Sequence, residues 1–157
     1  MKNESELAGV LAHEIGHINN RHIMKELPPP RETRGVVDWI AALLVAQGTV
    51  VSSALNEAVS KATELLFTKG YKISDEYEAD KSALFYADET GYNSKGLVDF
   101  LLRIKSFKEG NSSSVVYNTH PPFNDRISRL EEVIKSNRFN LEKPKNESRF
   151  INEIKNL

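Results

Sequence analysis

The sequence predicts a mainly α-helical fold with little or no sheet, and three observations support this. Apolar residues recur at helical spacing in most segments of the 157-residue chain. No convincing pair of strands and no internal repeat is found. Near the start, HEIGH places two histidines four residues apart, which is a spacing that puts both on one face of a helix. We expect one domain over residues 1–137 and a tail, residues 138–157, that carries a short helix packed on it.

Charge and composition exclude several classes of function. The chain has 21 Lys and Arg against 22 Asp and Glu, so its net charge of -1 favours neither nucleic acid nor an anionic membrane. It carries no nucleic-acid-binding motif. Because it has no cysteine, any metal site must use histidine and carboxylate ligands. The N-terminal MKNESELAG lacks the apolar core of a signal peptide, so none is predicted within this chain.

The first predicted helix runs from about Asn3 to Leu27. Asn3 or Ser5 can cap its start, and the prolines at 28–30 end it because proline lacks an N–H and clashes with the preceding turn. A charged linker at 31–34 follows. The apolar residues of this helix recur at helical spacing: Leu7, Val10, Leu11, Ile15, Ile18 and Ile23.

Residues 36–59, from Val36 to Val59, form the most apolar segment. A membrane-spanning helix needs roughly 20 predominantly apolar residues. Polar residues and one glycine interrupt this segment, so a buried or amphipathic helical hairpin is favoured over contact with a membrane or a partner protein. Both interpretations stay open here. The interrupting residues are Asp38, Gln47, Gly48, Asn56 and Glu57.

Further helices are predicted downstream. One covers residues 75–88 and is closed by Gly91; the next starts at Ser94; a third covers residues 124–136, and a last one lies near residues 148–154. A flexible loop, EGNSSS at 109–114, and a short apolar VVY separate the second from the third. The residues expected on inner helix faces are Leu97, Phe100, Leu101 and Ile104, then Ile127, Leu130, Val133 and Ile134.

His13 and His17 have the spacing of metal ligands. On a helix they lie about 40° apart, so both imidazoles project toward one point. Neutral imidazole is a good zinc donor, and three protein ligands plus water make a catalytic zinc site. Glu14 is placed to reach a metal-bound water as general base and to pass the proton to a leaving amine. The alternative is an ordinary pair of histidines on a helix surface.

A carboxylate from a distant helix is the favoured third ligand. One class of zinc peptidases has a third histidine six residues after the second, but position 23 is Ile, and His22 is rotated about 100° from that position. DEYEAD, residues 75–80, offers Glu76 and Asp80 at i and i+4. One of them can bind the metal while the other accepts the free ring N–H of a ligating histidine. The alternative for DEYEAD is a solvated acidic face.

Three blocks in this order resemble a known family: ELAGVLAHEIGHINNRH, GYKISDEYEAD and THPPFNDRISRL. They are similar to the HtpX-type and CAAX prenyl protease-type zinc endopeptidases, which are gluzincins. The resemblance covers about Glu6 to Leu130 and includes ADETGYNSKGLVDFLLRI. It implies a zincin-like helical metallopeptidase domain at residues 1–137, with one Zn²⁺ per chain. It also implies a metalloendopeptidase that acts on peptides or on unfolded or misfolded proteins.

The resemblance assigns a role to each matching residue of the zinc helix and of the acidic motif. His13 and His17 match the helix ligands, and Glu14 matches the general base. Glu76 matches the third zinc ligand, because the family pattern places it four residues before an aspartate. Asp80 is that aspartate, and it supports the ligands.

The remaining matches surround the ligands. His22 matches a histidine that is structural or supports a ligand, while Glu78 matches no required position and is expected to be solvated. His120 matches a histidine that stabilises the oxyanion or caps the zinc in a latent state. Arg126 matches an arginine that packs beneath that histidine and can pair with a carboxylate of the site. The alternative for THPP is a rigid turn into the last helix.

One part of the family pattern has no counterpart here. The resemblance implies strands ahead of the zinc helix, including an edge strand that binds the substrate backbone, whereas this chain starts almost at the helix cap. We therefore expect a catalytic-domain fragment or a minimal member of the family. The alternative function is a zinc-stabilised regulatory or interaction domain. A fragment of a longer exported protein would be located in the bacterial cell envelope or periplasm.

Overall fold

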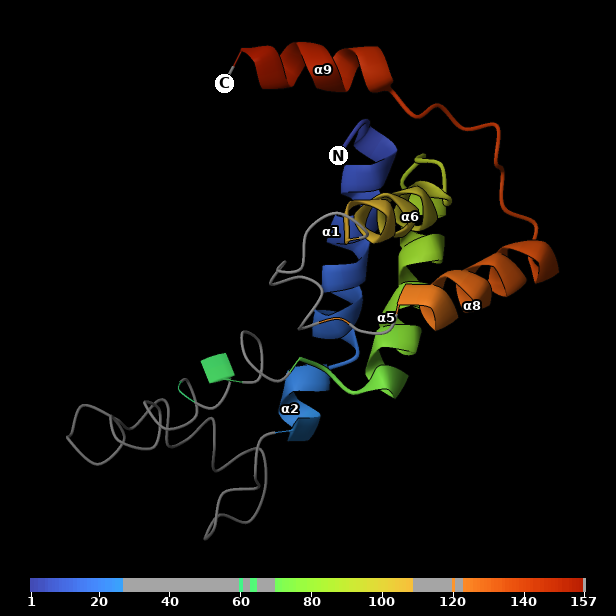
Figure 1. Cartoon of the computed structure of the whole chain (residues 1–157). Helices are drawn as coiled ribbons and strands as arrows, with labels where there is room; N and C mark the ends of the chain where they lie inside the picture. The colour runs from blue at the N-terminus through green and yellow to red at the C-terminus, as the bar shows by residue number, and fades with distance from the viewer. Residues whose placement is uncertain (27–59, 61–62, 65–69, 109–119, 121–122, 157) are drawn as a thin grey trace, which may run out of the picture.

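The computed structural model describes residues 1–26, 60, 63–64, 70–108, 120 and 123–156, and it confirms a mainly helical fold without strands in that part of the chain (Figure 1). The predictions for the proline run, the linker, residues 36–59 and the segment 109–117 lie outside the described residues. No helix in the described part is long and apolar enough to cross a membrane. The helices are α1 (Glu4–Asn19), α2 (His22–Glu26), α5 (Ile73–Glu89), α6 (Gly96–Lys108), α8 (Phe123–Ser136) and α9 (Glu147–Lys155).

Helices α1 and α5 lie side by side, and α6 crosses them (Figure 1). Two glycines of α1 permit these contacts. A Cβ at Gly16, the glycine of HEIGH, would lie 3.0 Å from the Cα and 3.1 Å from the carbonyl oxygen of Ala79 on α5. A Cβ at Gly9 would lie 2.5 Å from the backbone nitrogen of Leu97 on α6. The close approach at Gly16 brings the histidine face of α1 against the acidic face of α5.

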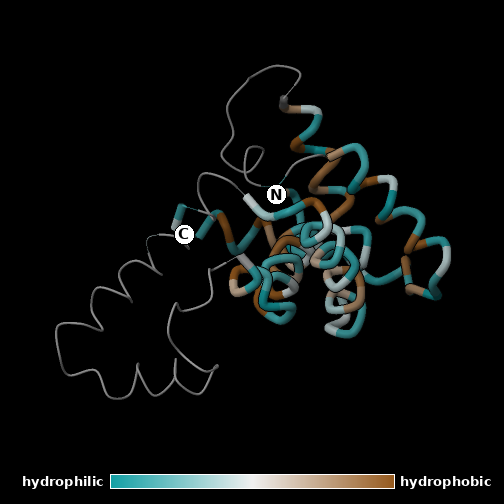
Figure 2. The backbone as a smooth tube through the Cα atoms, turned by 90° about the horizontal axis from the view of Figure 1, so that it is seen from below, coloured by the Kyte–Doolittle hydropathy of each residue, from teal (hydrophilic) through white to brown (hydrophobic). Residues whose placement is uncertain are grey.

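The hydrophobic core lies between α1, α5, α6 and α8. Among the residues predicted to face inward, Ile104, Val133 and Ile134 are only partly buried and pack against the core, and Phe100 is partly exposed. Along the helices, hydrophobic and hydrophilic segments alternate, as one-sided burial requires (Figure 2). The buried core residues are Ala12, Ala83, Leu84, Leu97, Val98, Leu101, Phe123, Ile127 and Leu130.

The prediction of one continuous first helix from Asn3 to Leu27 is wrong. Asn3 caps α1, since its side chain accepts a hydrogen bond from the Glu6 backbone N–H at 2.9 Å. The helix ends at Asn19, and Arg21 adopts a left-handed conformation with φ 53°. A non-glycine residue rarely has positive φ, and no periodicity in the sequence signals one. The turn at Arg21 redirects the chain so that α2 starts at His22.

Most of the apolar stripe of α1 points away from the core, although Val10 packs against it. Leu11 and Ile15 are each 53% exposed and Ile18 is 74% exposed, whereas Ala12, His13 and His17 are buried. The small and polar residues of α1 therefore make its contact with α5. This is the reverse of the usual amphipathic arrangement, and it arises because the buried face carries the histidines rather than large apolar side chains.

The C-terminal segment returns to α1. The side-chain amide of Asn93 donates to the backbone oxygens of Leu141 and Lys143, at 2.6 and 3.2 Å, and the Ser5 hydroxyl donates to Pro144. The helix predicted near residues 148–154 is confirmed as α9, on which Phe150 is buried. An apolar groove lies between α1, α5 and α9.

Candidate metal centre

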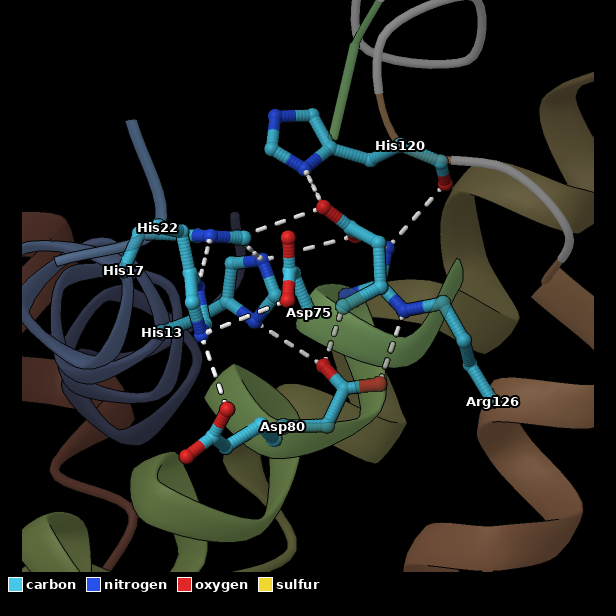
Figure 3. Close-up of polar contacts among 9 residues, drawn as sticks. His13, His17, His22, Asp75, Asp80, His120 and Arg126 are labelled. Atoms are coloured by element: carbon cyan, nitrogen blue, oxygen red, sulfur yellow. Dashed lines mark hydrogen bonds and ion pairs between the residues drawn. The ribbon is translucent and has the colours of Figure 1, made fainter. Parts of the chain in front are cut away.

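Two helices and one residue ahead of α8 bring four potential ligands together. His13 and His17 come from α1, and His120 precedes α8 (Figure 3). Glu76 comes from α5. Each offers one donor atom, and these atoms all lie within 4.8 Å of one another. His13, His17 and Glu76 are almost completely buried, and the side chain of His120 is 17% exposed.

The separations between these atoms fit a four-coordinate metal ion. The Nε2 atoms of His13 and His17 are 3.0 Å apart, and Glu76 Oε1 is 3.2 Å from His17 Nε2. Glu76 Oε2 is 3.6 Å from His13 Nε2. A tetrahedral ion with metal–ligand bonds of about 2.0–2.1 Å separates its ligand atoms by about 3.3 Å. The residues therefore fit the metal ion that the sequence motif implies.

A buried arginine and aspartate support the ligands from behind. The Arg126 guanidinium donates two hydrogen bonds to Asp80, at 2.8 and 2.7 Å, and its Nη1 lies 2.7 Å from Glu76 Oε2. It also donates to the His120 backbone oxygen at 3.1 Å. Asp80 Oδ1 in turn lies 2.9 Å from Nδ1 of His13. Asp80 and Arg126 thus hold His13, Glu76 and the His120 segment in one network.

The charges of the network favour the protonation states that metal binding needs. Burial alone would raise the pKa of Glu76, but hydrogen bonds from His120 and His17 and the charge of Arg126 hold that pKa far below its ordinary value. Burial would likewise raise the pKa of Asp80, and hydrogen bonds from His13 and Arg126 lower it instead. Burial lowers the pKa of His13, against the opposing effect of Asp80. Deprotonated carboxylates and neutral imidazole are the forms that bind a metal ion.

Glu14 lies outside the buried ligand group. It follows His13 on α1 but is exposed. Its charge is close enough to raise the pKa values of both Tyr71 and Arg126. A carboxylate at the rim of the ligand group, rather than among the ligands, has the location of a proton acceptor.

The expectation that Glu78 is merely solvated is incomplete. Its side chain is 52% exposed, but its Oε2 lies 3.1 Å from His22 Nε2 and 3.3 Å from Lys25 Nζ. His22 is fully buried, and its Nδ1 lies 2.8 Å from Nδ1 of His17. The structure thus places His22 between His17 and an acidic residue of α5.

Sequence reasoning missed two residues beside the ligands. The Tyr71 ring stacks on the His17 imidazole, with ring centroids 3.8 Å apart and an angle of 15° between the planes. Burial and the charges of Glu14, Glu76 and Asp75 raise the pKa of Tyr71. Asp75 is buried, and its Oδ1 is 3.8 Å from His22 Nε2. A signal existed for Asp75, since it lies three residues before Glu78 on the same helix face; Tyr71 precedes the helix and had none.

Comparisons with known proteins agree with this geometry. The model of peptidase family M48 matches residues 1–134. The metalloprotease YcaL of Escherichia coli is 26% identical over 136 residues, which are 87% of this chain and 52% of the relative. A protease HtpX homolog of Pelotomaculum thermopropionicum is 27% identical, covering 83% of this chain and 57% of the relative. The putative beta-barrel assembly-enhancing protease of Vibrio cholerae is 25% identical, over 83% of this chain and 28% of the relative.

The chain thus spans about half the length of YcaL and less of the Vibrio protein. No solved structure matches it.

Proposed function

Because the chain belongs to peptidase family M48, we propose that it forms the metal-binding part of a zinc metalloendopeptidase, with the ion held by His13, His17 and Glu76. The observation that carries this proposal is the convergence of these three donors, from two helices, at separations of 3.0 to 3.6 Å. Two histidines and one glutamate are a known ligand set for catalytic zinc. Imidazole also suits copper, iron and nickel, so metal analysis belongs in the test.

Zinc, when bound, would supply a Lewis acid that activates water and polarises the peptide carbonyl. The residues of the chain would perform the proton transfers. Glu14 is exposed beside the ligand group, so its carboxylate can take a proton from the attacking water and then protonate the leaving amine. The charge of Arg126 favours the ionised form of Glu76. Asp80, which Arg126 also contacts, holds the His13 ring in place.

His120 has two candidate roles. Its Nδ1 lies 2.9 Å from Glu76 Oε1, which places the ring at the edge of the ligand group. From there it can donate a hydrogen bond to the oxyanion that forms on the substrate carbonyl. In the alternative it is a fourth ligand that closes the site, because its donor atom belongs to the same group as those of His13, His17 and Glu76.

The proposed substrates are peptides and unfolded or misfolded proteins. The Vibrio relative is called a putative beta-barrel assembly-enhancing protease, and its name supports a protein substrate. The nearly balanced charge of this chain, -1, gives no reason to expect nucleic acid.

Metal analysis of the purified chain, coupled to cleavage of unfolded casein with and without chelator, tests the proposal. We expect one zinc per chain and cleavage that the chelator stops. Replacing Glu14 with Gln should abolish cleavage and leave zinc binding intact, because Glu14 is not a ligand. Cleavage by Glu14→Gln at the parent rate would refute the assigned mechanism, and failure to bind zinc after reconstitution would refute the metal site.

The second candidate is a zinc-stabilised interaction domain without activity of its own. The exposed apolar side chains of Leu11, Ile15 and Ile18 on the metal-binding helix favour it, since contiguous exposed apolar surface marks sites of protein contact. Stoichiometric zinc without cleavage of any unfolded protein would support this candidate over the first.

A further inference from the structure

Behind His17, on the side of its ring that faces away from Glu76, lies a second group of polar side chains. It contains His22 from α2 and Asp75 and Glu78 from α5. His22 is fully buried, so its ring nitrogens have no access to solvent. A buried imidazole needs hydrogen-bond partners at its nitrogens, and the structure provides them on both sides.

The proton positions in this group follow from the distances. His22 Nδ1 lies 2.8 Å from His17 Nδ1, so one of these two atoms donates and the other accepts. If Nε2 of His17 gives its lone pair to a metal ion, the proton of His17 must be on Nδ1. His22 Nδ1 is then the acceptor. The proton of His22 is consequently on Nε2, which lies 3.1 Å from Glu78 Oε2 and can donate to it.

We propose that His22 is a positioning residue for His17 and acts through a carboxylate–histidine–histidine relay. The relay starts at Glu78, with Asp75 adding negative charge beside it, and ends at the Nδ1–H of His17. It fixes the orientation of the His17 ring and the tautomer that leaves Nε2 free for the metal ion. This inference rests on the proposed zinc site.

The relay gives the two histidine ligands equivalent support by different routes. Nδ1 of His13 is 2.9 Å from the carboxylate of Asp80, which is a direct contact. No carboxylate among the described residues is in such contact with Nδ1 of His17. The imidazole of His22 bridges the distance from His17 to Glu78 and Asp75.

The backbone supports the same assignment. In an unbroken helix, residues five apart such as His17 and His22 would point about 140° apart. The left-handed turn at Arg21, with φ 53°, brings the two rings together instead. Such a conformation is costly for arginine, and strained residues of this kind cluster at functional sites.

A second metal ion in this group is the competing explanation, because His22, Asp75 and Glu78 also have suitable donor spacing. A cation is already present there. Lys25 Nζ lies 3.3 Å from Glu78 Oε2 and 3.9 Å from Asp75 Oδ1. Glu78 also accepts a hydrogen bond from His22. Lys25 therefore already supplies a positive charge beside both carboxylates, in the place that a second metal ion would take.

The test measures zinc affinity of the full chain by competition with a chelating dye. Replacing His22 with Leu should weaken zinc binding about 10–100-fold, as loss of a group that supports a ligand typically does. His22→Gln should bind more tightly than His22→Leu, because its amide oxygen can accept from His17 and its nitrogen can donate to Glu78. Met24→Ala on the same helix is the control, since Met24 is 56% exposed and is not a member of the relay, and it should leave the affinity unchanged.

Nitrogen-15 NMR of the zinc-loaded parent gives a readout that requires no variant to fold. We expect His17 protonated at Nδ1, with that proton coupled to the His22 ring, and His22 protonated at Nε2. A proton on Nδ1 of His22 would overturn the relay. So would two zinc ions per chain, or equal zinc affinity of the parent and a folded His22→Leu. A parent chain that binds no zinc would overturn the proposed function and the relay with it.

Discussion

Replacing Arg126 with methionine removes the positive charge at the centre of the ligand network. Arg126 is 2% exposed and contacts both Asp80 and Glu76. Methionine keeps an unbranched apolar chain of similar length, so the change is mainly electrostatic. Two buried carboxylates then lose a partner.

The expected loss of stability is large. Removing one partner of a buried ion pair costs about 3–5 kcal/mol, because the remaining charge is left uncompensated. Asp80 keeps its contact with His13, and Glu76 keeps those with His17 and His120, so we expect the lower end, about 3 kcal/mol. With a urea m value of about 2 kcal/mol/M, the midpoint of unfolding would fall by about 1.5 M.

Urea unfolding of the metal-free chain, followed by circular dichroism, measures this shift. Arg149→Met is the matched control, since Arg149 also contacts one carboxylate with two nitrogens, that of Glu4, but is exposed to solvent. Solvent screens that pair, so the control should shift the midpoint far less. Adding zinc should restore part of the stability of Arg126→Met by compensating Glu76. Equal shifts for the two arginines would refute the argument that burial decides the magnitude.

Three further predictions concern packing, metal and pH. Gly16→Ala gains about 1 kcal/mol of helix propensity but costs about 1–3 kcal/mol in overpacking against Ala79, and it should weaken zinc binding. Gly9→Ala clashes with α6 instead, so it should lower the stability of the fold without weakening zinc binding. Equal zinc affinities of the two variants would contradict this. Zinc at a concentration of about 1,000 times its Kd should stabilise the fold by about 4 kcal/mol, so its removal should lower Tm by roughly 8–16 °C. An unchanged Tm in calorimetry would contradict a contribution of the metal to stability. Folding lowers the pKa of His13 from 6.5, so the unfolded chain binds a proton more readily, and the metal-free protein should lose stability below about pH 6.5. The lowered pKa values of Glu76 and Asp80 should steepen this loss below about pH 4.5. A free energy of unfolding that stays constant between pH 7 and pH 4 would contradict both expectations.

Much of the secondary structure was predictable because it depends on local rules. Asn3 caps α1 through its own side chain, and Gly91, with φ 87°, ends α5 where a left-handed residue is needed. Helical spacing placed Leu97, Leu101, Ile127 and Leu130 in the core. The break at Arg21 was not predictable, since a left-handed arginine has no compositional signal.

The burial of α1 could not be predicted from its apolar residues. Leu11, Ile15 and Ile18 recur at helical spacing, yet they are exposed. Periodicity identifies a face but does not say what packs against it. The fit of Gly16 against Ala79 selects the opposite face for burial, because only that face lets the backbones of α1 and α5 approach closely.

The sequence by itself determined the chemistry that is available: two histidines on one helical face, acidic residues at helical spacing, and no thiolate. Hydrogen bonding within a helix fixes the direction of side chains three or four residues apart, so this much is local. Only the tertiary structure decided which of these groups meet. Glu76, His120 and Arg126 reach His13 and His17 across at least 59 positions of sequence, and His22 supports His17 because the chain turns at Arg21. Such meetings depend on how helices pack, and residue spacing does not encode packing.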